Sequence, residues 1–413
     1  MYQNLAILAA FAFLYSSVSG GLARTPVNGA LVFMAFGTAM GPLGLGVLDL
    51  DIDAEGLRIM AELTLALVLF TDAAGANLRE LQHSYRIPLR LLLVGLPLTI
   101  GLGYIAGLVL LDGLGWVEVA ILAVMLAPTD AALGKAVVTN PAVPGPLREG
   151  LNLESGLNDG ICVPILFVFL LLASEAGAAG DTTTVALQLV AESVGIGVAL
   201  GVALTWLAVK LLRVVNGRGW MTQSWEQITL PALAVACFGF TQWLGGSGFI
   251  ACFVGGLCFG AMEREGTHAR LLDAEGVGDT MALLTWVAFG AAVVGQGLLT
   301  LTWQVVLYAF LSLTAIRMIP VYLALTGLPL GASEKLFVGW FGPRGLASIV
   351  FAVIVLEEKL PGGGTVIDAV VATIVLSVLL HGLTANPLVA ALGRAVQTHY
   401  PVRDKPAPYA DEK

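Results

Sequence analysis

Residues 116–135 read WVEVAILAVMLAPTDAALGK, an apolar run with a polar break inside it. A membrane-spanning helix needs about 20 mostly apolar residues. Pro128 has no backbone N–H to donate, and it disfavours helix in the residue before it. Because Thr129 and Asp130 follow at once, the stretch predicts an unwound or kinked span whose freed oxygens could bind a hard cation. A kinked packing helix with a buried, paired aspartate is the structural alternative.

The composition of the whole chain supports a membrane protein. Of its 413 residues, 57% are hydrophobic and only 12% are charged, whereas soluble domains carry about 25% charged residues. The 50 glycines suit helices that approach closely in lipid. The net charge of −9 and the lack of a basic run give no sign of a nucleic-acid partner. The four cysteines have no metal-ligand spacing, so we interpret them as small core residues and expect no cofactor.

Thirteen apolar segments could cross the membrane, the first of them interpreted as a span and not as a signal peptide. They are residues 4–19, 27–44, 57–76, 87–111, 116–138, 147–173, 184–212, 226–244, 246–262, 277–298, 303–327, 335–356 and 366–392. We therefore predict an all-α membrane protein with one transmembrane domain at 1–393 and a short cytoplasmic tail at 394–413.

The distribution of charge in the loops orients these spans. With the N-terminus outside, most Lys and Arg residues fall in cytoplasmic loops and the tail, and the outer side keeps only Arg58 and Lys359. The outer loops read DLDID, SEAGAAGD and EEKLPGGG. This asymmetry follows the positive-inside rule and supports the count of thirteen.

A second polar stretch lies in the sixth predicted span, where residues 148–164 read REGLNLESGLNDGICVP. Glu154 and Asn158 are four residues apart and share a helix face, and Ser155 and Asp159 share the next face. Ionisable groups in the hydrocarbon layer are costly and usually mark an ion pathway or a buried pair. A polar packing seam between helices is the alternative.

A third stretch predicts a second interrupted helix. Residues 339–350 read GWFGPRGLASIV, in which Gly342, Pro343 and Gly345 surround Arg344. At 1.5 Å per residue, Asp130 lies about 9 Å and Arg344 about 13 Å from the inner edge of the hydrocarbon core. Two breaks at similar depth, seven spans apart, are what an inverted repeat of spans 1–6 and 8–13 would produce.

The runs TDAALGKAVVTN, ESGLNDG and FGPRG resemble the cation:proton antiporter-1 family, the bacterial sodium/proton antiporters of the NhaP type and their animal exchanger relatives. The resemblance covers the whole chain. It implies that Asp159 is the essential carboxylate that carries either the cation or the proton. The neighbours that it implies around the ion are Thr129, Asp130 and Ser155, with Asp72 in LFTDAAG as a further acid.

The resemblance also assigns supporting roles. Asn158 matches the asparagine of electroneutral members, Glu154 and Arg344 are expected to form a buried ion pair, and Arg317 is expected to be mainly structural. Pro128 and Pro343 are expected to keep the two helices broken. His381 lies in the last span, where we expect it to pack between helices.

These residues suit the exchange of a monovalent cation for a proton. Hard cations prefer oxygen ligands, and a carboxyl group in a low dielectric can hold a proton near neutral pH. We therefore predict electroneutral exchange of one Na⁺ for one H⁺ by alternating access, serving pH and sodium homeostasis. A K⁺/H⁺ antiporter is the alternative in the same class, with Li⁺ also a possible cargo. A passive cation channel and an intramembrane enzyme fit less well, because the chain has no repeated pore ring and no HExxH motif.

The resemblance further implies a homodimer in the lipid of the bacterial inner membrane. Spans 3–6 and 10–13 are expected to form a moving ion-binding core, and the other spans a dimerisation scaffold. The chain ends soon after the last span, so we expect no soluble regulatory domain.

Overall fold

All regular secondary structure in the described residues is helical. The computed structural model describes residues 2–22, 25, 27–48, 54–75, 85–130, 133–175, 182–263, 267–294 and 301–399. The predicted outer loop at 49–53, Arg24, Arg79, Arg264 and the tail beyond His399 lie outside these residues. The elements used below are α1 (Tyr2–Leu22), α2 (Gly29–Met40), α3 (Ala54–Gly75), α5 (Arg86–Arg90), the π-helix η1 (Leu91–Gly95), α6 (Leu96–Leu110), α7 (Trp116–Met125), α8 (Lys135–Val138), α9 (Gly145–Glu175), α10 (Thr182–Gly217), α11 (Gln223–Glu226), α12 (Thr229–Trp243), α13 (Gly248–Met262), α14 (Thr267–Phe289), the π-helix η2 (Gly290–Val294), α16 (Trp303–Leu313), α17 (Ala315–Ala324), α18 (Ala332–Trp340), α19 (Leu346–Glu357) and α20 (Gly363–His399).

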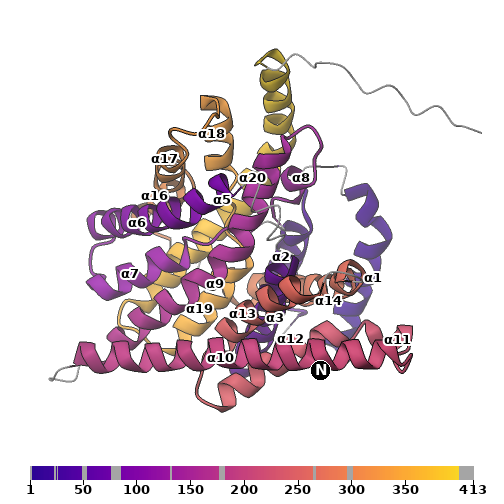
Figure 1. Ribbon diagram of the computed structural model, residues 1–413. Coiled ribbons are helices and arrows are strands. Elements are labelled where there is room, and N and C mark those ends of the chain that lie inside the picture. The colour runs from indigo at the N-terminus through magenta and orange to yellow at the C-terminus, as the bar shows by residue number, and fades with distance from the viewer. Residues whose placement is uncertain are drawn as a thin grey trace, which may run out of the picture.

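Many of these helices have the length and composition of membrane spans. Within the described residues, seven helical segments are long and apolar enough to cross a bilayer, and four shorter apolar helices accompany them. Each of the thirteen predicted ranges contains helix, while the number of crossings and the inverted repeat stay predictions. Figure 1 shows α10 along one edge of the molecule and the C-terminal end of α20 projecting from the opposite edge.

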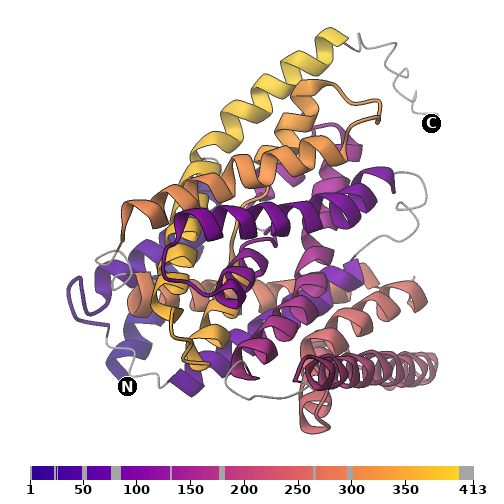
Figure 2. The same ribbon diagram turned by 90° about the vertical axis from the view of Figure 1, so that its left-hand side faces the viewer.

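The helices pack into two groups, which we name by their members. The scaffold bundle consists of α2, α3, α10, α12, α13 and α14, which contact one another extensively. The site bundle consists of α5, η1, α6, α7, α8, α9 and α16 to α20. The two meet where α3 lies against α9 and α19 and where α10 lies against α9. Figure 2 shows α10 end-on at the lower edge of the molecule.

This packing differs from the predicted division, which assigned residues 57–76 and 277–298 to the moving core. In the structure α3 and α14 pack mainly in the scaffold bundle. Glycines explain the close approach: a Cβ on Gly256 of α13 would lie 2.3 Å from the Phe70 carbonyl oxygen of α3. A Cβ on Gly37 of α2 would likewise lie 2.1 Å from the carbonyl oxygen of Val287 in α14. These contacts join segments far apart in the chain.

Both predicted breaks are present in the site bundle. Helix α7 ends at Met125, residues 126–130 are not helical, and α8 begins at Lys135. Helix α18 ends at Trp340, and α19 begins at Leu346. Residues 126–130 and 341–345 lie against each other, because the Asp130 amide donates to the Pro343 carbonyl over 2.8 Å. The two interruptions therefore form one crossing.

Candidate ion-binding site

The crossing places one charged side chain at the C-terminal end of α7 and another at the N-terminal end of α19. The Nη1 group of Arg344 donates to the carbonyls of Ala127 (2.6 Å) and Pro128 (3.0 Å), just beyond the C-terminal end of α7. Asp130 accepts from the Leu346 amide at the start of α19 over 3.0 Å. A cation at a helix C-terminus and an anion at an N-terminus are both stabilising. Each broken helix thus receives its counter-charge from the other.

Asp130 is held mainly by backbone amides. Its Oδ2 accepts from Leu346, and its Oδ1 accepts from the Leu133 amide over 3.3 Å. A Cβ on Gly345 would lie 2.0 Å from Asp130 Oδ2, so only glycine allows this approach. The carboxylate therefore caps α19, a structural task that the sequence did not predict. Its predicted role as an ion ligand stays a prediction.

Helix α9 brings its polar face against the first break, as predicted. The Ser155 hydroxyl donates to the Thr129 carbonyl over 2.7 Å, and the Asn158 amide donates to the Thr129 hydroxyl over 2.8 Å. Thr129, Ser155 and Asn158 are all buried. A cavity of about 10 Å³ lies beside Thr129, Asp130 and Ser155, which is the size needed for one water molecule or a small ion.

Asp159 lies one turn beyond Ser155 on the same helix and is only 8% exposed. Its Oδ1 atom has no hydrogen-bond partner among the described residues. Asp130 and Asp72 both act on it electrostatically. A buried carboxylate without a partner is costly. Asp159 is therefore the acidic side chain here whose surroundings leave room for a proton or a cation.

Asp72 approaches this centre from the scaffold bundle. A Cβ on Gly156 of α9 would lie 3.3 Å from the Asp72 Cβ, so the two helices pass closely at this point. The Asp72 side chain is exposed. Glu275 and Asp279 of α14 act on it electrostatically. The sequence interpretation missed these two acids, because it placed them at or beyond the edge of the tenth span.

The predicted ion pair between Glu154 and Arg344 is wrong in the structure. Glu154 instead forms a two-bond pair with Arg317 of α17, in which Nη1–Oε1 is 2.5 Å and Nη2–Oε2 is 2.6 Å. Both side chains are 1% exposed. Arg344 instead binds the carbonyls of the first break through Nη1, and its Nε and Nη2 have no hydrogen-bond partner among the described residues. Gly342 explains how Arg317 reaches in, because a Cβ there would lie 2.5 Å from Arg317 Nε.

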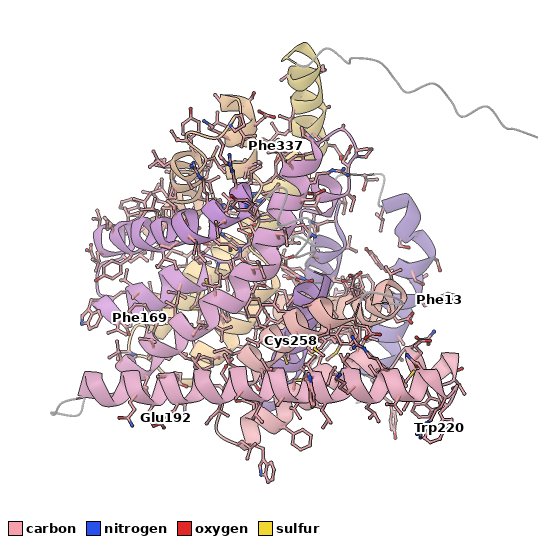
Figure 3. The ribbon with its side chains drawn as sticks, viewed as in Figure 1. Phe13, Phe169, Glu192, Trp220, Cys258 and Phe337 are labelled. Carbon is pink, nitrogen blue, oxygen red and sulfur yellow. The ribbon has the colours of Figure 1, made fainter. Side chains whose placement is uncertain are left out.

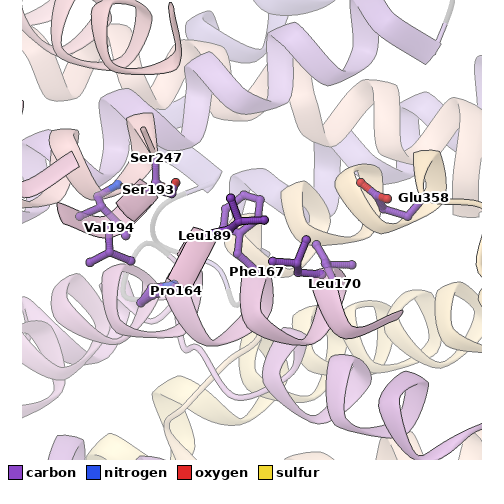
Figure 4. Close-up of a pocket in the computed structure, with 10 residues that line it drawn as sticks. Pro164, Phe167, Leu170, Leu189, Ser193, Val194, Ser247 and Glu358 are labelled. Atoms are coloured by element: carbon purple, nitrogen blue, oxygen red, sulfur yellow. Dashed lines mark hydrogen bonds between the residues drawn. The ribbon is translucent and has the colours of Figure 1, made fainter. Parts of the chain in front are cut away.

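Two other features lie away from the crossing. Glu192 projects from the outer face of α10 (Figure 3), where it accepts a hydrogen bond from Gln188. A larger apolar cavity of about 290 Å³ lies between α9, α10 and α13, with Glu358 at its edge (Figure 4). None of the predicted ion-binding residues lines it.

Comparison with known proteins agrees with this picture. Residues 7–391 match the family described as sodium/hydrogen exchanger, transmembrane. The chain is 24% identical over 380 residues to the K(+)/H(+) antiporter NhaP2 of Shewanella oneidensis, covering 91% of this chain and 64% of the relative. It is 26% identical over 330 residues to the Na(+)/H(+) antiporter 2 of Zygosaccharomyces rouxii, covering 70% of this chain and 40% of that protein. The chain thus spans less than two thirds of the length of these curated relatives.

The fold also matches a solved structure. The sodium proton antiporter MjNhaP1 from Methanocaldococcus jannaschii superposes with a TM-score of 0.73 at 20% identity, covering 95% of this chain and 99% of that one. The family match covers nearly all of the chain, and it confirms the predicted membership of the cation:proton antiporter-1 group. The chain therefore belongs to the sodium/hydrogen exchanger family of multi-pass membrane proteins.

Proposed function

We propose that this protein exchanges one monovalent cation, Na⁺, for one proton, with both ions competing for Asp159. The single observation that carries the proposal is the buried Asp159 carboxylate with its unpartnered Oδ1, one turn from Ser155 at the helix crossing. The family is one of transporters and not of enzymes. Asp159 would therefore bind and release its cargo without covalent chemistry.

The neighbouring oxygens support a cation at this carboxylate. The Thr129 carbonyl, the Ser155 hydroxyl and the Asp130 carboxylate lie at the same crossing, and oxygen is the ligand that hard cations prefer. Thr129 and Ser155 would complete the shell of an ion held by Asp159. Asp130 would add negative charge while remaining bound to the α19 amides.

Asn158 supports an electroneutral exchange. Its amide donates to Thr129 and cannot titrate, whereas an aspartate at this position could carry a second charge. Glu154 is neutralised by Arg317. Asp159 is then the side chain of the α9 polar face that alternates between proton and cation, so one positive charge would move in each direction.

Alternating access would move the site bundle against the scaffold bundle. The proposal includes a homodimer in the bacterial inner membrane. Its N-terminus would lie outside and its C-terminus in the cytoplasm, an orientation that the charge asymmetry of the loops supports. Because α3 and α14 pack in the scaffold bundle, the moving part would comprise spans 4–6 and 11–13, fewer than the sequence led us to expect.

K⁺ is the second candidate cargo. The Shewanella relatives carry the name K(+)/H(+) antiporter, while the Zygosaccharomyces relative is named for Na⁺. Oxygen ligands alone do not fix the ion radius. Exchange rates measured with Na⁺, K⁺ and Li⁺ in the same vesicles would rank the three cargoes.

The decisive experiment is proton/cation exchange in proteoliposomes with wild type, Asp159→Asn and the surface control Glu192→Gln. We expect wild type and the control to exchange Na⁺ for protons at a rate independent of a clamped membrane potential, and Asp159→Asn to be inactive. Full exchange by Asp159→Asn would refute the proposed site. A cation flux without proton counter-flux would indicate a channel instead.

A further inference from the structure

His381 of α20 lies against both ends of the second break. Its imidazole is 2% exposed. Nε2 lies 2.8 Å from the carbonyl oxygen of Trp340, the last residue of α18. Nδ1 lies 2.9 Å from the Ser377 carbonyl oxygen and 3.3 Å from the Ser377 hydroxyl. The Trp340 indole stacks on the ring, with centroids 5.2 Å apart.

Ser377 connects the ring to the other end of the break. The Arg344 amide donates to the Ser377 hydroxyl over 2.7 Å. A serine hydroxyl can accept one hydrogen bond and donate its own proton to another group. The same hydroxyl lies 3.3 Å from Nδ1 of His381, so a series of contacts runs from the Arg344 N–H through Ser377 to the imidazole.

Each ring nitrogen of His381 lies within hydrogen-bond distance of a carbonyl oxygen. With the ring proton on Nε2, the imidazole donates to the Trp340 carbonyl and can accept from the Ser377 hydroxyl. With the proton on Nδ1, it donates to the Ser377 carbonyl instead. The cations Arg317 and Arg344 also act on the ring. The imidazole therefore lies between Trp340 of α18 and Ser377 of α20, with one nitrogen facing each residue.

The segment held in this way builds the crossing. Residues 341–345 supply the Pro343 carbonyl that accepts from Asp130 and the Arg344 guanidinium that binds the carbonyls of Ala127 and Pro128. Thr129 follows directly and contacts Ser155 and Asn158 of α9. A shift of 341–345 would therefore move the Thr129 oxygens that contact α9.

We propose that His381 is a positioning residue for the ion exchange. Its imidazole, together with Ser377, fixes segment 341–345 from both ends and thereby sets the affinity of the cation site. The inference rests on the proposed function for its transport readout, but the position of the segment can be measured without transport.

The test compares His381→Leu, His381→Gln and Ser377→Ala with Thr373→Val. Glutamine keeps an N–H donor for Trp340, while leucine fills the space without one. Thr373 is a buried residue one turn from Ser377, and its hydroxyl bonds to Ala369 within α20, so its loss controls for a polar deletion on the same helix. Ser377→Ala keeps the test decisive if His381→Leu does not fold.

The first readout is the half-saturating cation concentration in proteoliposomes. We expect His381→Leu and Ser377→Ala to raise it by about tenfold, the effect of one lost buried hydrogen bond. His381→Gln and Thr373→Val are expected to stay within about twofold of wild type. A lower maximal rate with unchanged half-saturation in His381→Leu and Ser377→Ala would overturn the inference, because it would indicate a packing role only.

The second readout is amide hydrogen exchange of Asp130 and Arg344 in the purified protein. The Asp130 amide donates across the crossing to Pro343, and the Arg344 amide donates to Ser377 of α20. We therefore expect faster exchange in His381→Leu and Ser377→Ala than in His381→Gln. Unchanged protection in all variants would overturn the inference. Wild type without any cation/proton exchange would refute the proposed function alone, since this amide measurement needs no transport.

Discussion

The pair between Glu154 and Arg317 gives the sharpest test of the structure. Both side chains are 1% exposed and share two short hydrogen bonds. Replacing Glu154 with glutamine removes the charge and leaves a buried guanidinium without its counter-ion. Breaking one side of a buried ion pair costs about 3–5 kcal/mol. At about 2 °C per kcal/mol in a large chain, we expect the apparent melting temperature to fall by about 5–10 °C.

A double-mutant cycle identifies the partner. Melting curves of the detergent-solubilised protein would be recorded for Glu154→Gln, Arg317→Met and the double variant, and again with Arg344→Met in place of Arg317→Met. We expect the 154–317 double variant to be no less stable than the worse single variant, because neither side is then left as an unpaired charge. The coupling energy should exceed about 2 kcal/mol for 154 with 317.

The same cycle can refute the reasoning. Arg344→Met should destabilise on its own, because it removes the contacts to Ala127 and Pro128. Glu154 acts on Arg344 electrostatically without a hydrogen bond between them, so the coupling of Arg344→Met to Glu154→Gln should be smaller than that of Arg317→Met. A coupling of 154 with 344 as large as with 317 would show that the pair in the structure is wrong. Additive losses at 154 and 317 would show the same.

Three further outcomes follow from the contacts. Gly345→Ala should abolish exchange in vesicles, because its Cβ would lie 2.0 Å from Asp130 Oδ2, whereas Gly101→Ala, with no atom within 4 Å, should be silent. Asp130→Ala should lower stability in melting curves by about 0.5–2 kcal/mol through loss of the α19 cap, and an unchanged melting temperature would contradict that cap. Arg58→Gln should cost less than about 1 kcal/mol even though Arg58 pairs with Glu357 across the two bundles, because exposed pairs are weak; the loss should shrink further at high salt.

The sequence predicted the local parts of the site well. The two breaks could be inferred without knowing any neighbouring helix, because Pro128 in the first and Gly342 and Pro343 in the second act on their own backbone. The four-residue spacing on α9 predicted two polar faces, one with Glu154 and Asn158 and one with Ser155 and Asp159. Helical periodicity could identify these faces, but not that Asn158 of one and Ser155 of the other would both contact Thr129.

Contacts between distant helices could not be predicted in the same way. From the sequence, Glu154 could pair with either of two buried arginines, Arg317 or Arg344. Its pairing with Arg317 depends on the space that Gly342 leaves. The membership of α3 in the scaffold bundle depends on its fit against Gly256 of α13. His381 showed no signal beyond its place in a span, because its partners Trp340 and Ser377 become significant only once the break is folded against α20.

Asp72 and Asp159 belong to different bundles, and this gives the fold a simple electrostatic property. The two carboxylates repel when both are bare, and their repulsion falls as they separate. Any sliding of one bundle along the other would change that separation. If Asp159 binds a proton or a metal ion as proposed, the energy of each position would depend on which of them it holds, so the empty and the loaded protein would follow different energy profiles.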